Sequence, residues 1–184
     1  IIPFSLRGQD FEWAKSAGGS EDDKGNSVAV DLSGNMYMTG SFQSPSITLE
    51  TVTLINSGFY NIYLAKYDLN GNVLWAKCIG GTGTDIGMAI AVDPSGNLYL
   101  TGSFSSPTIT FGTTILTTAG LADIYLAKFD SDGTVLWAKR IGGTGNEDGF
   151  AIAFDATGNL YLTGNFDSPS ISFGTTNFNN PMRH

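Results

Sequence analysis

The chain has 184 residues, of which 17 are acidic and 9 basic, so its formal net charge is −8. That balance excludes a nucleic-acid-binding protein, because phosphate binding needs a concentrated surface of Lys and Arg. The single cysteine, Cys78, excludes an intrachain disulfide and a cysteine-based zinc site, and the single histidine, His184, is the last residue. No apolar run approaches the ~20 residues that a membrane-spanning helix needs. With 41% hydrophobic residues, the sequence predicts a folded chain rather than a disordered one.

The sequence repeats itself every 62 residues, from Trp13 to Phe173, without an insertion. The clearest markers are three tryptophans, three Gly-Gly pairs, and three aspartates that each precede a Gly-Asn pair. They are Trp13, Trp75 and Trp137; Gly18-Gly19, Gly80-Gly81 and Gly142-Gly143; and Asp31, Asp93 and Asp155. A period of this length indicates repeated supersecondary units, each packed against the next.

The predicted elements of one unit are clearest between residues 86 and 141. A first strand begins at Ile86, where large residues alternate with glycine and alanine, so both of its faces are uncharged. This pattern suits the crowded innermost strand of a radial array of sheets. A tight turn follows at Asp93–Asn97, and then a second strand at Leu98–Phe104. The Thr-rich segment Ser105–Gly120 contains alternating apolar residues, which favours an additional short hairpin.

Two more strands complete the unit. The third strand, Ile124–Phe129, ends at the turn Asp130–Gly133, and the fourth, Val135–Ile141, carries Trp137. Four antiparallel strands in a repeated unit are typical of the blades of a β-propeller. The sequence therefore predicts an all-β fold made of propeller blades.

The phase of the repeat divides the chain into blades. We expect an N-terminal tail with an orphan outer strand at 1–17, blade 1 at 18–79, blade 2 at 80–141 and an incomplete blade 3 at 142–184. The orphan strand is expected at Phe11–Ala17. About three repeats make an incomplete ring, since propellers have 4–8 blades. We therefore expect either a fragment of a longer chain whose further blades close the ring, or a protomer that associates through its open blade faces.

These residues resemble the bacterial SBBP-type β-propeller repeat family. The resemblance covers nearly the whole chain, although Trp-Ala-Lys precedes Gly-Gly where the family commonly has a Tyr-containing strand. The matching string in the second unit is Gly80-Gly81, Asp85, Ala89–Asp93, Gly96–Gly102 and Asp123–Lys128. The resemblance implies a scaffold in a secreted or surface-attached bacterial protein. It implies no catalytic residues and no cofactor.

The spacing from Gly71 to Trp75 and from Gly133 to Trp137 also resembles the tryptophan-docking motif of quinoprotein-type propellers. In that motif a tryptophan of the outer strand locks adjacent blades together. The turn that ends at Gly133 is one residue shorter than the turn of the motif. The resemblance implies a docking role for the three repeated tryptophans and does not imply a bound quinone.

Acidic residues gather in the loops that lead from an outer strand to the next inner strand. They are Glu21, Asp22, Asp23, Asp85, Glu147 and Asp148. Carboxylate oxygens are ligands that Ca²⁺ prefers, so these residues are candidates for a calcium site. A solvated acidic rim that aids solubility is the favoured interpretation, because no Asp-x-Asp-x-Asp-Gly string completes a calcium loop.

A second set of aspartates stands at the end of each inner strand. Asp31, Asp93 and Asp155 either line a central channel or accept backbone N–H bonds in the following turns. The second interpretation is favoured, because Asp before a tight turn is typical of such bonds and Gly34, Gly96 and Gly158 occupy the tight reversals.

The polar positions recur with the repeat, whereas an enzyme needs an asymmetric set of polar groups placed once. The sequence therefore favours a non-enzymatic extracellular or cell-surface scaffold that binds a protein or glycan partner through its loop-rich face. Two alternatives stay open. The chain is part of a propeller enzyme or cofactor-binding domain that missing blades complete, or it is a structural subunit of a surface appendage or larger assembly.

Overall fold

The computed structural model describes residues 13–180, which form an all-β structure without helices. The predicted fold class is confirmed. Blade 1 is a sheet of β1 (Asp23–Val30), β2 (Met36–Phe42), β5 (Asn61–Tyr67) and β6 (Val73–Ile79), in that order. Blade 2 repeats it with β7 (Asp85–Val92), β8 (Leu98–Phe104), β11 (Asp123–Phe129) and β12 (Val135–Ile141). All neighbouring strands within both sheets are antiparallel.

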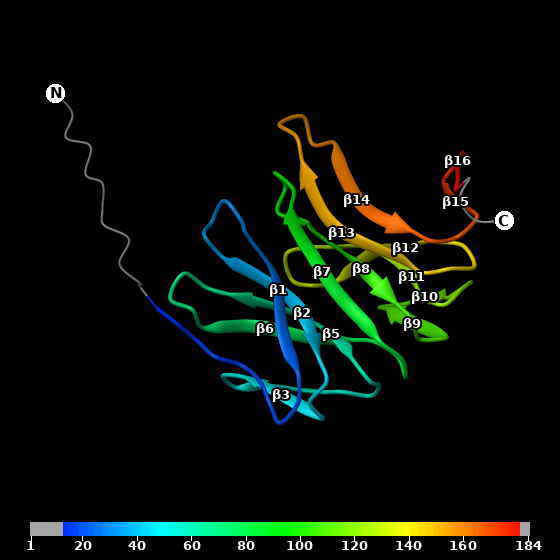
Figure 1. Cartoon of the computed structure of the whole chain (residues 1–184). Coiled ribbons are helices and arrows are strands. Elements are labelled where there is room, and N and C mark those ends of the chain that lie inside the picture. Colours follow the sequence, from blue (N-terminus) through cyan, green and yellow to red (C-terminus); the bar gives the residue numbers. More distant parts are fainter. Residues whose placement is uncertain (1–12, 181–184) are drawn as a thin grey trace.

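The third blade holds an inner pair of strands in the described residues, β13 (Glu147–Phe154) and β14 (Leu160–Phe166). The inner strands β1, β7 and β13 lie side by side, and the sheets fan outward from them (Figure 1). Each inner strand carries a register shift at the same place, at Gly25/Ser27, Gly87/Ala89 and Gly149/Ala151. At this place blade 1 approaches blade 2 closely, since a Cβ on Gly87 would overlap Thr39 Oγ1 and would lie 3.0 Å from Ile62 Cγ2.

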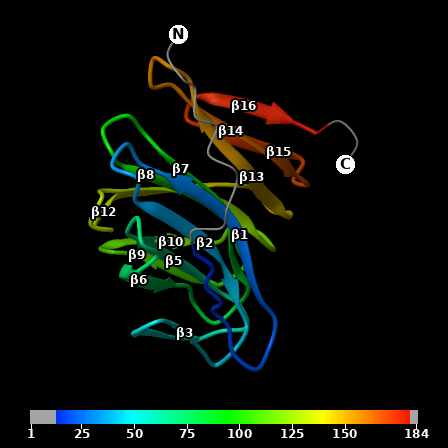
Figure 2. The ribbon, with the colours of Figure 1, turned by 90° about the vertical axis from the view of Figure 1, so that its left-hand side faces the viewer.

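Each blade also carries a short hairpin between its second and third strand positions. These are β3 (Ser46–Leu49) with β4 (Val52–Ile55), β9 (Thr108–Phe111) with β10 (Thr114–Thr117), and β15 (Ser170–Phe173) with β16 (Thr176–Asn179). The hairpin predicted within Ser105–Gly120 is confirmed. Figure 2 shows the β3–β4 hairpin at one end of the fan and the β15–β16 hairpin at the other.

The core lies between blades. Tyr37 and Leu64 of blade 1 pack with Leu100 and Tyr125 of blade 2, and Phe111 of the β9–β10 hairpin joins them. A second cluster covers the other face of blade 1, where the β3–β4 hairpin packs over β2 and β5. Because β5 has neighbours on both faces, every one of its seven residues is buried.

The orphan strand differs from the expectation. Residues 13–19 form no strand, and Phe11 and Glu12 lie outside the described residues. An outer strand needs a third strand to pair with, as β6 pairs with β5, and no such partner lies beside residues 13–17 in the part of the chain that is described. Trp13 nevertheless packs on blade 1, with its ring stacked on Tyr67 at a centroid distance of 6.3 Å.

Candidate functional site: the loop face

One face of the fan is built from the Gly-Gly loops between blades and from the segments that flank each short hairpin; we call it the loop face. Its loops are bonded from blade to blade. Phe59 N donates to Gly83 O at 3.0 Å, and Asp85 N donates to Tyr60 O at 2.9 Å. The next junction repeats both bonds, from Leu121 N to Gly145 O and from Glu147 N to Ala122 O. The loop face therefore has a backbone fixed by hydrogen bonds, although it carries little regular structure.

Asp85, a candidate calcium ligand, is a buried acceptor on this face. Its side chain is fully buried and accepts bonds from Gly81 N at 2.7 Å, Ser106 N at 3.2 Å and Ser106 Oγ at 2.6 Å. Ser106 Oγ accepts in turn from Gly83 N at 2.9 Å. Burial raises the pKa of Asp85, and the hydrogen bonds from Ser106 and Gly81 oppose that rise. The carboxylate thus ties the Gly-Gly loop to the connection that follows β8.

The same arrangement recurs in the other two blades. Glu147, also fully buried, accepts from Gly143 N at 2.9 Å, Ser168 N at 3.0 Å and Ser168 Oγ at 2.5 Å. Asp23 is less buried and accepts from Gly19 N at 2.7 Å and Ser44 Oγ at 2.7 Å. Sequence reasoning missed the three serines, Ser44, Ser106 and Ser168, although their spacing of 62 residues was visible. Asp85 and Glu147 are buried rather than solvated, which corrects the interpretation of these two residues as an acidic rim.

The other three calcium candidates do not share this arrangement. Glu21 is exposed, and its backbone N donates to Ser44 Oγ at 2.9 Å. Asp22 is exposed, pairs with Lys24 at 2.6 Å and accepts from Tyr60 Oη at 3.1 Å. Asp148 lies in β13, where its backbone N donates to Asn165 Oδ1 at 3.1 Å. Across residues 13–180, no three His, Cys, Asp or Glu side chains gather as metal ligands would.

We expect EDTA to leave the melting temperature of the chain unchanged. The carboxylates of Asp23, Asp85 and Glu147 already accept protein N–H and O–H bonds, so a calcium ion would have to displace these donors to reach the oxygens. Thermal unfolding followed by circular dichroism, in the presence and absence of millimolar EDTA or Ca²⁺, tests whether the melting temperature changes. A melting temperature that falls in EDTA and recovers in Ca²⁺ would restore the calcium hypothesis.

The loop face also exposes aromatic and apolar side chains. Phe59 is 56% exposed and packs edge-on against Tyr60, with ring centroids 5.1 Å apart. Lys24 Nζ lies 5.7 Å from the Tyr60 ring. Leu121, which is 68% exposed, occupies the position in blade 2 that Phe59 occupies in blade 1. An exposed apolar residue thus recurs at one loop position, held by the blade-to-blade backbone bonds.

The opposite face, which we call the turn face, holds Asp31, Asp93 and Asp155. Asp93 Oδ1 accepts from Ser95 N at 2.9 Å and Asn97 N at 2.8 Å, and Asp93 Oδ2 accepts from Asn97 Nδ2 at 2.8 Å. Asp31 and Asp155 accept the equivalent backbone bonds in their own turns. Gly34, Gly96 and Gly158 occupy these turns with φ of 81°, 82° and 87°. Burial alone would raise the pKa of Asp93, but the bonds from Asn97 and Ser95 lower it overall.

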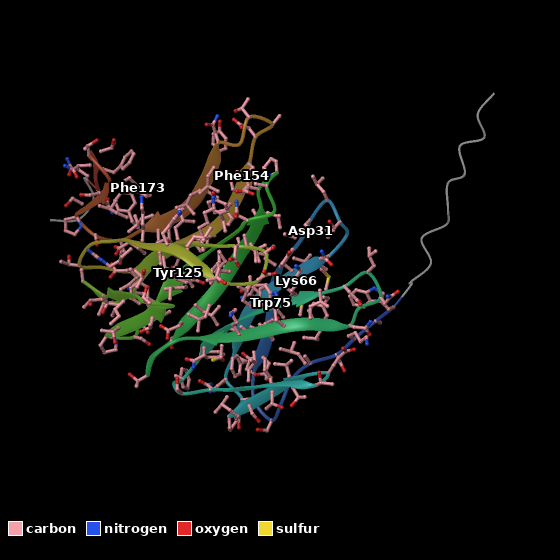
Figure 3. The ribbon with its side chains drawn as sticks, turned by 180° about the vertical axis from the view of Figure 1, so that it is seen from behind. Asp31, Lys66, Trp75, Tyr125, Phe154 and Phe173 are labelled. Atoms are coloured by element: carbon pink, nitrogen blue, oxygen red, sulfur yellow. The ribbon has the colours of Figure 1, made fainter. Side chains whose placement is uncertain are left out.

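Trp75 lies at the junction of blades 1 and 2. Its Nε1 donates to Ser131 O of the blade 2 turn at 3.4 Å, and Lys66 Nζ donates to the same oxygen at 3.0 Å. Figure 3 shows Trp75, Lys66 and Asp31 gathered at this junction. Trp13 contacts Gly71 as Trp75 contacts Gly133, and Trp137 packs edge-on against Tyr99 at 5.9 Å. The tryptophans of β6 and of the N-terminal segment each contact a turn of the blade that follows.

The sequence matches the model of the SBBP β-propeller repeat at residues 12–41, 74–103 and 136–165. In the second match, the segment runs from β6 of one blade into β8 of the next. The described residues contain no helix long and apolar enough to cross a membrane.

Two curated proteins are similar to the chain. It is 31% identical over 165 residues to an uncharacterized WD-repeat-containing protein of Acanthamoeba polyphaga mimivirus, which covers 82% of this chain and 12% of that protein. It is 28% identical over 138 residues to the regulatory protein FlaEY of Caulobacter vibrioides, which covers 71% of this chain and 14% of that protein. The chain therefore spans only a small part of the length of these relatives.

A solved structure of a protein of unknown function from Bacteroides caccae aligns with 87% of this chain and 62% of its own, at 12% identity and a TM-score of 0.36. The repeat matches recur at the 62-residue spacing of the sheets. The sequence and the blades together show that the chain belongs to the SBBP β-propeller repeat family.

Proposed function

We propose that the chain is a non-enzymatic propeller scaffold that binds a protein or carbohydrate partner through its loop face, as part of an extracellular or cell-surface bacterial protein. The observation that carries this proposal is the exposed ring of Phe59, which packs edge-on against the half-buried Tyr60 on a backbone fixed by blade-to-blade bonds. Exposed aromatic rings supply much contact area at little conformational cost, and loops held by a rigid scaffold are common binding sites.

The acidic side chains of the loop face support the non-enzymatic part of the proposal. The carboxylates of Asp85 and Glu147 occupy equivalent places and hold equivalent backbone donors. A residue that recurs in every repeat, and whose carboxylate oxygens already accept backbone N–H bonds, is typical of a structural role. Catalytic residues, in contrast, form an asymmetric set that occurs once.

Changing Phe59 to serine is expected to weaken partner binding at least ~10-fold, because interface aromatics commonly contribute more than 1–2 kcal/mol each. Leu74→Ser is the matched control, since Leu74 is 52% exposed on the outer strand β6, away from the loop face. The probes are a glycan array and a displayed peptide library, each applied to the wild type and both variants.

Binding to either probe that Phe59→Ser weakens and Leu74→Ser leaves intact supports the proposal. If neither probe yields a ligand that depends on Phe59, the proposal fails. Replacing the whole segment Ser105–Gly120 is a poorer test, because that change also removes Ser106, the partner of the buried Asp85.

A further inference from the structure

A groove runs along the outer rim between blades 1 and 2, beside the β9–β10 hairpin. Its volume is about 460 Å³. Lys77 and Ile79 of β6 form one wall, and Phe111, Gly112 and Val135 form the other. One cationic side chain therefore lies beside apolar walls in a space open to solvent.

An equivalent groove lies one repeat earlier, at the N-terminal side of blade 1, but a carboxylate partly fills it. Its volume there is about 80 Å³, and Lys15, Leu49 and Glu50 are among its lining residues. Glu50 forms an ion pair with Lys15 and accepts from Val73 N at 2.9 Å. At the 62-residue spacing, Lys77, Gly112 and Val135 are the equivalents of Lys15, Glu50 and Val73.

Glu50 occupies a backbone position that suits glycine. Its φ is 54°, and the equivalent Gly112 and Gly174 have φ of 59° and 61°. A side chain in this left-handed region is unfavourable, so the ion pair with Lys15 holds Glu50 against a backbone preference. The groove at the N-terminal side of blade 1 thus shows that a lysine at this position accepts a carboxylate as its ligand.

Lys77 lacks such a partner within residues 13–180, where it forms no ion pair. Its Nζ lies 5.9 Å from the centre of the Trp75 ring. The bonds from Thr134 N and Asp132 N to Asp130 Oδ1 lower the pKa of Asp130, and the charge of Lys77 contributes more weakly to the same shift. Within residues 13–180 the ammonium of Lys77 therefore has no ion-pair partner, although the equivalent groove of blade 1 already holds a carboxylate.

We propose that the groove between blades 1 and 2 binds the carboxylate of a glutamate or aspartate presented by a protein partner, with Lys77 as the ion-pair donor. Gly112 has no side chain, so the entrance of the groove between blades 1 and 2 is open. At the equivalent position, Glu50 closes the groove at the N-terminal side of blade 1. The net charge of −8 repels an acidic partner at long range. At physiological salt that repulsion is screened beyond about 8 Å, so the short ion pair supplies selectivity rather than long-range attraction.

The test uses the full chain and two acetylated, amidated pentapeptides. The first has the sequence of residues 48–52, Thr-Leu-Glu-Thr-Val, and the second carries Glu50→Gln. Titrations at ~0.15 M salt are followed by NMR of the isotope-labelled chain, read at the Lys77 side chain. We expect the glutamate peptide to shift the Lys77 signals and to bind at least ~10-fold more tightly than the glutamine peptide, a difference that corresponds to about 1.4 kcal/mol.

Lys77→Gln should abolish the difference between the two peptides, whereas Lys24→Gln, on the loop face, should keep it. Gly112→Glu should pair with Lys77 inside the chain and prevent peptide binding. Equal binding of both peptides, or no shift at Lys77 at millimolar peptide, overturns the proposal. If Gly112→Glu fails to fold, the Lys77→Gln comparison still decides. Phe59 is not part of this groove. A failure of the groove proposal can therefore be distinguished from a failure of the loop-face proposal.

Discussion

Replacing Asp85 by alanine is expected to lower the free energy of unfolding by about 2–4 kcal/mol, because buried donors left without an acceptor cost roughly 1–3 kcal/mol each. The carboxylate accepts from Gly81 N, Ser106 N and Ser106 Oγ, and its side chain is fully buried. The hydroxyl of Ser106 can rotate toward another acceptor, whereas the two backbone N–H groups are fixed. Urea denaturation followed by fluorescence and circular dichroism measures the change.

Two matched variants distinguish the loss of the buried hydrogen bonds of Asp85 from the general effect of removing an acidic side chain. Asp132→Ala removes an exposed carboxylate of a turn and should change stability by less than about 0.5 kcal/mol. Asp23→Ala removes the same type of acceptor from a more exposed site, so its cost should lie between the other two. An Asp85→Ala cost no larger than that of Asp132→Ala would show that the buried bonds are not important for stability.

The ionisation of Asp85 gives the same comparison a pH signature. Burial raises the pKa of Asp85 in the folded chain above its unfolded value of about 3.9. Between these two values the folded state binds more protons, so the contribution of Asp85 to stability falls as pH rises through the folded pKa. The stability advantage of the wild type over Asp85→Asn should therefore be larger below pH 4 than at pH 7. An advantage that grows with pH would mean that the folded pKa is lowered instead.

Local chemistry made some of the site predictable. Asp93 accepts bonds from residues two and four positions later, so the sequence of one turn contains both the acceptor and its donors. The hairpin within Ser105–Gly120 was equally local, since β9 and β10 pair across a short turn. The 62-residue repeat then carried each such local prediction into the other units.

The bonds of Asp85 were not predictable in this way. Ser106 lies 21 residues further along the chain, and the bond from Asp85 N reaches Tyr60 of the preceding blade. The burial of the carboxylate results from the stacking of one blade's loop on the next, which no local pattern encodes. The recurrence of Ser44, Ser106 and Ser168 was the available signal, but without the fold it does not indicate which side chain they bind.

Replacing Gly102 by alanine is expected to cost about 3 kcal/mol or to prevent folding, because a methyl group forced into a close-packed site destabilises by 1–3 kcal/mol and sometimes more. A Cβ on Gly102 would overlap the carbonyl oxygen of Ile86, which the bulge of β7 directs at β8, and Gly40 and Gly164 have the same conflict in the other blades. Gly96→Ala is the control, since its Cβ would meet nothing within 4 Å and only its φ of 82° opposes the change, at about 1–2 kcal/mol. The urea midpoints of the two variants measure these losses of stability. Equal losses would mean that backbone conformation, and not the approach of the Ile86 carbonyl, requires glycine after the repeated threonine.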